Sequence, residues 1–128
     1  MTPGLLNRGQ VHIEMDPKKL EEQRQRVQTI RRQLPEFIYG LYPNEDYDPG
    51  VMRQQKDMIT LPDGAQYEGE WNSQTEQRHG RGYQIWSDGS IYEGYWKFDK
   101  ANGRGRLIHA DGDIYDGYWK DDKAHGFG

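Results

Sequence analysis

The chain has 128 residues, enough for one small domain, and its formal net charge is −4. Only 33% of the residues are hydrophobic and the mean hydropathy is −1.17, a composition close to that of disordered chains. The lack of cysteine excludes a disulfide framework, a zinc–thiolate site and a cysteine nucleophile, and fits an intracellular, reducing compartment. No stretch has the length of a signal-peptide core or of a membrane span.

Residues 1–57 are predicted to form an irregular arm, one helix and a connector. Asp16 can cap a helix, Pro17 is tolerated at the first helical position and Pro35 ends a helix, so we expect a helix over about 17–34. An isolated helix of this length is marginally stable in water, so its apolar side should rest on the remaining chain or on another protein. That apolar stripe consists of Leu20, Val27, Ile30 and Leu34.

The same helix partly resembles a calmodulin-binding motif of the IQ class. Val27, Gln28 and Arg32 match the motif, but its glycine and second basic residue are missing. Calmodulin is therefore a weak candidate partner. A helix that anchors the chain to its own sheet or to a neighbour in an assembly is the favoured interpretation.

Residues 58–128 contain one pattern three times. Asp-Gly-x-x-Tyr-Glu/Asp-Gly-x-Trp occurs at 63–71, 88–96 and 111–119, with the tyrosines of successive copies 25 and 23 residues apart. Most of the nine Tyr and four Trp lie in these copies, which supplies the apolar area that the average composition lacks. Self-similarity of this kind predicts an array of stacked supersecondary units, which offers surfaces rather than catalytic pockets.

Within each copy, apolar and polar residues alternate with period two, and a second short strand precedes the Asp-Gly pair. Asp-Gly between two such runs is a strong hairpin signal, so three hairpins are predicted at roughly 58–71, 82–96 and 105–119, joined by longer polar loops. The fold class is therefore mainly β, with three consecutive hairpins and six antiparallel strands, and we expect the array to continue beyond residue 128.

A glycine stands between the Tyr and the Trp of each copy, at Gly69, Gly94 and Gly117. A missing side chain at these positions would open a slot for a ring from a neighbouring strand. We therefore expect a stack of rings, in edge-to-face or offset contact, to form the core of the sheet.

The repeated motif and the intervening His/Asn-Gly-x-Gly segments resemble MORN (membrane occupation and recognition nexus) repeats over about residues 59–128. Three departures are a first linker that is two residues longer, Asn102 in place of His, and a chain that stops at Gly128 where another strand should begin. The resemblance implies an elongated single-layer antiparallel sheet of consecutive hairpins. It also implies structural aromatics at Tyr67, Trp71, Tyr92, Trp96, Tyr115 and Trp119. With the Asp-Gly turns, the expected turn glycines are Gly64, Gly80, Gly82, Gly89, Gly103, Gly105, Gly112 and Gly126.

The family resemblance implies a non-enzymatic scaffold or adaptor in the cytoplasm or cytoskeleton that acts through protein–protein interaction. Such repeats occur in radial spokes and other axonemal proteins, in apicomplexan scaffolds, in junctional membrane proteins, and beside the catalytic domains of some phosphoinositide kinases and lysine methyltransferases. We favour a larger assembly such as a radial spoke of the ciliary axoneme. The alternative is the regulatory region of a phosphoinositide kinase or another enzyme whose catalytic domain lies outside this chain.

Charge narrows the class of partner. Residues 59–128 hold 8 basic and 12 acidic residues, whereas residues 1–58 hold nine of each. An acidic array disfavours nucleic acid and makes direct binding to anionic membranes a poor match. The expected partners are therefore other proteins.

No residue is predicted to be catalytic or to bind a metal or cofactor. His79 and His125 repeat, but the middle copy has Asn102, so a role in turns is favoured over metal binding. The carboxylates at Glu68, Glu93 and Asp116 are expected to be solvated or paired across strands. The Gly-Arg-Gly segments lack the lysine and the strand-to-helix setting of a phosphate-binding loop.

One face of a single-layer sheet is uncovered, and apolar side chains on it could bind a partner helix or strand. Core packing is an equally weighted interpretation of the same residues. The candidate partner-binding residues on the sheet are Trp86, Ile91, Tyr95 and Tyr118, and those on the helix are Leu20, Val27, Ile30 and Leu34.

Overall fold

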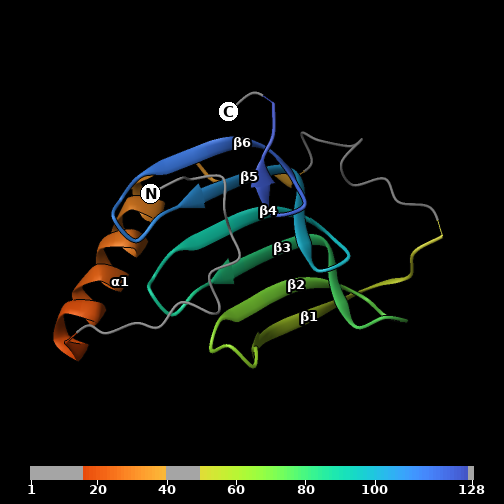
Figure 1. Ribbon diagram of the computed structural model, residues 1–128, viewed down its shortest axis with the longest axis horizontal. Coiled ribbons are helices and arrows are strands. Elements are labelled where there is room, and N and C mark those ends of the chain that lie inside the picture. Colours follow the sequence, from red (N-terminus) through yellow and green to blue (C-terminus); the bar gives the residue numbers. More distant parts are fainter. Residues whose placement is uncertain (1–15, 40–49, 127–128) are drawn as a thin grey trace.

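The computed structural model describes residues 16–39 and 50–126 (Figure 1). In these ranges, one helix precedes a seven-stranded antiparallel sheet whose strands follow one another in chain order, so the predicted mainly β fold of consecutive hairpins is confirmed. The elements are α1 (Pro17–Gln33), β1 (Arg53–Thr60), β2 (Gln66–Asn72), β3 (Gln77–Ile85), β4 (Ile91–Lys97), β5 (Lys100–Ile108), β6 (Ile114–Lys120) and β7 (Lys123–Ala124).

The strand count and the links between hairpins differ from the prediction of six strands and long polar loops. Strands β4 and β5 are joined by the pair Phe98-Asp99 (φ 44° and 73°), and β6 and β7 by Asp121-Asp122 (φ 49° and 69°). Two successive residues with positive φ form the tight turn whose twist matches that of the flanking strands. The expected loops are therefore mostly strand, and a short seventh strand follows β6.

This difference corrects the assignment of four glycines and one histidine to turns. Glycines at the Gly-x-Gly positions lie inside β3 and β5, and His79 lies buried in β3. Gly126 lies just after β7 with φ 74°, whereas the glycines of the Asp-Gly pairs lie in the hairpin turns with φ between 90° and 97°. The strand glycines are Gly80, Gly82, Gly103 and Gly105; the hairpin-turn glycines are Gly64, Gly89 and Gly112.

Helix α1 starts as expected. The Asp16 side chain accepts a hydrogen bond from the Lys18 amide, Pro17 is the first helical residue, and Leu34 follows the last turn. The helix packs on the chain's own sheet, where Val27 is fully buried against Ile91 of β4 and Ile108 of β5. The apolar stripe of α1 was expected to pack either on the remaining chain or on another protein. In the structure it packs on the chain's own sheet (Figure 1).

The two faces of the sheet have different cores. The helix face holds Val27, Ile91 and Ile108, with Ile30, Leu34, Tyr83 and Ile85 packed around them. The opposite face, here called the aromatic face, holds the buried Tyr and Trp rings of the repeats. Alternation along each strand sends Tyr92 and Trp96 to the aromatic face and Ile91 and Tyr95 to the other. The sheet is thus a single layer with a core on each side.

Candidate docking site

The aromatic face is built around one continuous series of rings. Each neighbouring pair in the series meets edge to face, with centroids 5.1 to 5.5 Å apart and interplanar angles between 81° and 90°. This geometry places the positive edge of one ring against the negative face of the next. The predicted stack of rings is present. The series runs in the order Trp71, Tyr67, Trp96, Tyr92, Trp119 and Tyr115.

Strand glycines make room for the tyrosines. A Cβ added to Gly82 of β3 would lie 2.5 Å from Cζ of Tyr67, and one added to Gly105 of β5 would lie 2.5 Å from Cε1 of Tyr92. Both distances are far below van der Waals contact, so only glycine allows the rings to cross these strands. The space expected at Gly69 and Gly94 is therefore formed by pairs of glycines on adjacent strands, Gly69 with Gly82 and Gly94 with Gly105.

Polar atoms of the rings are satisfied by backbone carbonyls. The Tyr67 hydroxyl donates to the Glu70 carbonyl (2.8 Å) and the Tyr92 hydroxyl to the Tyr95 carbonyl (3.0 Å). The indole Nε1 of Trp96 donates to the carbonyl of Gly82. Burial raises the pKa values of the Tyr67 and Tyr92 hydroxyls above their ordinary value of 10.0, so both remain protonated donors.

The first repeat lacks one of these hydrogen bonds. The indoles of Trp96 and Trp119 donate to the carbonyls of Gly82 and Gly105 on the preceding strand. Each of these two glycines pairs with the residue that lies two positions before the tryptophan. In the first repeat that residue is Gly69, and its partner on β1 is Lys56. The Nε1 atom of Trp71 is buried and has no hydrogen-bond partner among the residues that the structure describes.

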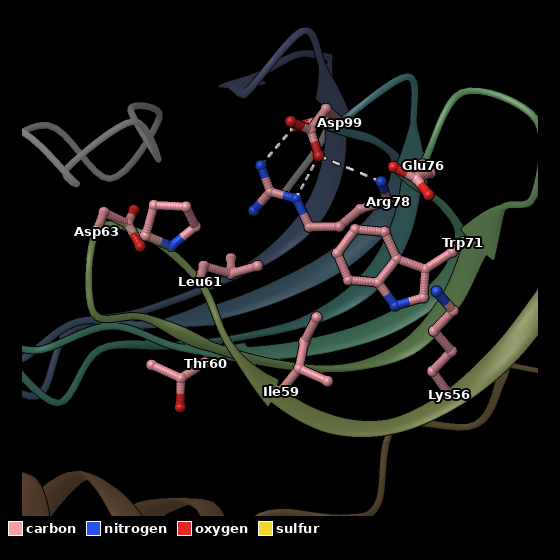
Figure 2. Close-up of a pocket in the computed structure, with 10 residues that line it drawn as sticks. Lys56, Ile59, Thr60, Leu61, Asp63, Trp71, Glu76, Arg78 and Asp99 are labelled. Atoms are coloured by element: carbon pink, nitrogen blue, oxygen red, sulfur yellow. Dashed lines mark hydrogen bonds and ion pairs between the residues drawn. The ribbon is translucent and has the colours of Figure 1, made fainter.

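A groove of about 590 Å³ opens beside Trp71 on the aromatic face (Figure 2). In Figure 2, the Trp71 indole lies between the Lys56 side chain and the ion pair of Arg78 with Asp99. The Lys56 ammonium lies 5.6 Å from the centre of the indole ring. Apolar side chains of Ile59 and Leu61 and the ring of Pro62 complete the wall, with Thr60, Asp63 and Glu76 at its margins.

Arg78 forms the opposite wall of the groove. Its guanidinium lies 4.5 Å from the centre of the Trp96 ring, donates from Nε to Asp99 at 2.7 Å and also bonds Gln84. Desolvation opposes the charged form of Asp99, but the hydrogen bond and charge of Arg78 outweigh it and lower the pKa of that carboxyl. This wall is therefore held in place by an ion pair and an aromatic contact.

The helix face is closed by charged and aromatic contacts. Glu93 accepts hydrogen bonds from Arg31 of α1 (3.0 Å) and from Arg106 of β5 (3.2 Å). The Tyr39 hydroxyl donates to the Gly82 carbonyl, and the Tyr95 hydroxyl donates to the Tyr39 carbonyl. The segment from α1 to Tyr39 thus covers the face of β3 to β5 opposite the ring series.

The covered face changes the interpretation of the candidate partner-binding residues. An open patch and core packing were equally weighted for Trp86, Ile91 and Tyr95. All three are buried within the chain, Trp86 on the aromatic face and the other two on the opposite face. Tyr118 is exposed. Among the helix residues, Val27 is buried and Leu20, Ile30 and Leu34 are partly buried. Sequence periodicity identified the apolar faces but not which of them the chain covers itself.

Two of the side chains considered as metal ligands or catalytic carboxylates, His79 and Asp116, have structural partners. His79 accepts a hydrogen bond at Nδ1 from the Phe98 amide (3.0 Å). Asp116 pairs with Arg104 at 2.6 Å, and Glu68 is exposed. Within residues 16–39 and 50–126, no three potential metal ligands of the His, Cys, Asp and Glu types gather in one place. Over the same ranges, no helix has the length and apolar character of a membrane crossing.

The groove itself was not predicted. Its lining includes residues of the first hairpin and its turn, as well as three residues from beyond that hairpin, Glu76, Arg78 and Asp99. Two signals were available in the sequence. The first linker is two residues longer than the second, and Lys56 stands where the later hairpins have Gly82 and Gly105. Those departures mark the first repeat as the one whose ring series is incomplete.

Comparison with curated protein sequences finds no match. The family model described as MORN repeat matches three consecutive segments, residues 77–91, 92–114 and 115–128. The first hairpin lies outside the matched segments, although its Tyr67 and Trp71 make the same ring contact as their counterparts in the matched repeats. MORN repeats are non-catalytic modules that mediate protein–protein interaction, and the three matches support a MORN repeat protein.

Proposed function

We propose that this chain is a non-enzymatic adaptor that uses the aromatic face of its repeat sheet to hold a partner within a larger assembly. One observation carries the proposal: α1 covers the helix face, whereas the aromatic face retains a groove of about 590 Å³ beside Trp71. The described residues 16–39 and 50–126 leave this face uncovered at the groove, where Ile59, Leu61 and an aromatic ring offer a surface suited to a protein partner.

The setting we propose is a cytoskeletal assembly, with a radial spoke of the ciliary axoneme as the favoured example. Support comes from the family's occurrence in such assemblies. The acidic repeat region agrees with protein partners rather than with anionic membrane lipid. Calmodulin binding through α1 has no added support, because Val27 of the partial motif is buried against the sheet.

Proximity labelling with the tagged chain in a ciliated cell tests this setting. We expect the wild-type chain to label axonemal proteins, and we expect Ile59→Ser in the groove to reduce that labelling. The matched control is Thr60→Ala, a change at the groove margin that removes no apolar wall. Labelling confined to a lipid kinase or methyltransferase would favour the alternative, a regulatory region of an enzyme. Labelling unaffected by Ile59→Ser would contradict docking through the groove.

A further inference from the structure

We propose that the groove beside Trp71 is a receptor for an aromatic side chain of a partner protein, presented together with a backbone carbonyl that accepts a hydrogen bond from Trp71 Nε1. The inference rests on the proposed adaptor role and names the place and chemistry of one docking contact. It follows from comparing the first repeat with the two that follow it, because these show which groups complete the same surroundings elsewhere in the chain.

A carbonyl acceptor is missing. Trp96 and Trp119 donate from Nε1 to strand carbonyls at 3.2 and 3.0 Å. Trp71 is nine-tenths buried, yet its Nε1 has no hydrogen-bond partner within residues 16–39 and 50–126. The Lys56 carbonyl in the equivalent place accepts a hydrogen bond from the Gln55 side chain instead. Leaving a buried donor without an acceptor destabilises the structure. A partner that brings a carbonyl to this atom removes that destabilisation.

A ring is missing as well. The indoles of Trp96 and Trp119 each contact two tyrosines, one from their own strand and one from the preceding hairpin. Among the residues that the structure describes, Trp71 contacts one ring, that of Tyr67. The second place beside the indole is occupied by the ammonium of Lys56. Because Lys56 is exposed, its side chain can leave the indole without disrupting a core.

The ring has to enter from the groove rather than on an added strand. On β3 and β5, the tyrosine of the preceding strand crosses at a glycine, and any Cβ there would overlap the ring. On β1 the same position is Lys56, and the pairing of β1 with β2 shifts register between Lys56 and Ile59. A side chain and a bulge at an edge both block regular strand addition. The aromatic face above the strand stays accessible through the groove.

The occupant is therefore defined by its chemistry. It is a segment of a partner protein with an aromatic side chain, packed edge to face on Trp71 as Tyr92 packs on Trp119, and with a nearby main-chain carbonyl. Ile59 and Leu61 offer the apolar floor for the remainder of the segment.

The test uses the full chain with nitrogen-15 in its four indoles, whose N–H signals are resolved by NMR. The probe is N-acetyl-tyrosine N-methylamide, and N-acetyl-alanine N-methylamide is the control that has the carbonyls without the ring. We expect a saturable downfield shift of the Trp71 signal with the tyrosine probe, while Trp96 and Trp119 stay unchanged because their donors are already bonded.

Two variants sharpen the result. Lys56→Ser removes the ammonium from the indole and should tighten binding of the tyrosine probe, whereas Trp71→Phe keeps a ring, removes the donor and should weaken it about threefold to tenfold. Affinity of the Trp71→Phe chain is followed by the signals of the probe itself. Trp86→Phe, a buried aromatic change outside the groove lining, is the matched control and should bind normally.

The inference is overturned if the Trp71 signal does not shift saturably in either the wild type or the folded Lys56→Ser chain. It is also overturned if the alanine probe shifts that signal as strongly as the tyrosine probe, because the ring would then contribute nothing. Partner labelling that depends on Ile59 but not on Trp71 or on any aromatic residue of the partner would retain the adaptor role and reject this contact.

Discussion

At the scale of single residues, the ring series depends on positions with no side chain. Tyr67 and Tyr92 reach the next tryptophan only by crossing β3 and β5 at a glycine. The glycine and the ring are therefore one unit divided between two strands. Substitutions at either member should affect stability through the other.

Gly105→Ala tests this coupling. The added Cβ would overlap the Tyr92 ring, so we expect a loss of about 1–3 kcal/mol, typical of overpacking. In the Tyr92→Ala background the ring is absent and the same change should cost much less, giving a coupling energy of about 0.5 kcal/mol or more. Urea denaturation of the two single variants and the double variant measures it. Additive losses would show that the ring can move aside.

Alkaline pH should destabilise the fold through the same tyrosines. Burial raises the folded-state pKa of Tyr67 and Tyr92 above 10.0, so above about pH 10 the unfolded chain loses these protons first and stability falls as pH rises. Thermal melts from about pH 9 to 11 should show Tm decreasing, and Tyr92→Phe should lessen the slope. Tyr118→Phe, at an exposed tyrosine, is the control. Equal slopes in both variants would contradict the assignment.

At the scale of elements, α1 is the cover of one sheet face. Its contacts combine the apolar cluster around Val27 with the pairing of Arg31 and Glu93. Desolvation disfavours the charged form of Arg31, but the hydrogen bond and charge of Glu93 outweigh this effect and raise the pKa of Arg31. The pair therefore stays ionised. The helix is therefore part of the fold and not a free arm.

Val27→Asp is the direct test of this cover. The carboxylate would enter a fully buried apolar site, and we expect a loss of about 3–4 kcal/mol, near the upper end for single substitutions. Arg26→Asp changes the neighbouring exposed position and should shift stability by no more than about 0.5 kcal/mol. Chemical denaturation followed by fluorescence compares them. A similar small loss in both would mean that α1 does not bury Val27 in solution.

Much of this architecture could be predicted, and the misses have physical causes. Period-two patterning and Asp-Gly turns gave the hairpins, and Asp16 with Pro35 gave the helix. The tight turn between β4 and β5 was not predicted, because Phe98-Asp99 contains no glycine and nothing in the sequence indicated its positive φ values. The groove was not predicted, because one of its walls is the ion pair of Arg78 with Asp99, which forms only when the chain folds. Burial of Ile91 depended on where α1 docks, which periodicity does not specify.

At the scale of the whole molecule, the sheet has two unlike edges. On one side β1 is exposed along nearly its whole length; on the other, β7 pairs with only the end of β6, at Trp119 and Lys120. The interior strands β4 and β5 contribute residues to both cores. Stability should therefore decrease from the middle of the sheet toward both sides.

Amide exchange followed by mass spectrometry should show this gradient. We expect peptides from β1 and from residues 114–117 of β6 to exchange much faster than peptides from β4, because edge amides lack a second strand and open locally. Exchange at several protein concentrations separates local opening from association at the edges. Equally slow exchange across β1, β4 and β6 in a monomeric sample would contradict the gradient.

The position of α1 on the sheet also sets a ratio of lengths. Gln23 and Arg24 donate to carbonyls in the turn of the second repeat, at Asp88 and Ser87, and Ile30 lies against Gly112 in the turn of the third. Six helical residues rise about 9 Å, and two strand spacings measure about 9.5 Å. The rise of the helix between these contacts thus matches the spacing of neighbouring hairpins. Because α1 contacts the turns of both hairpins, it fixes the distance between them and so limits how far the sheet can bend or twist.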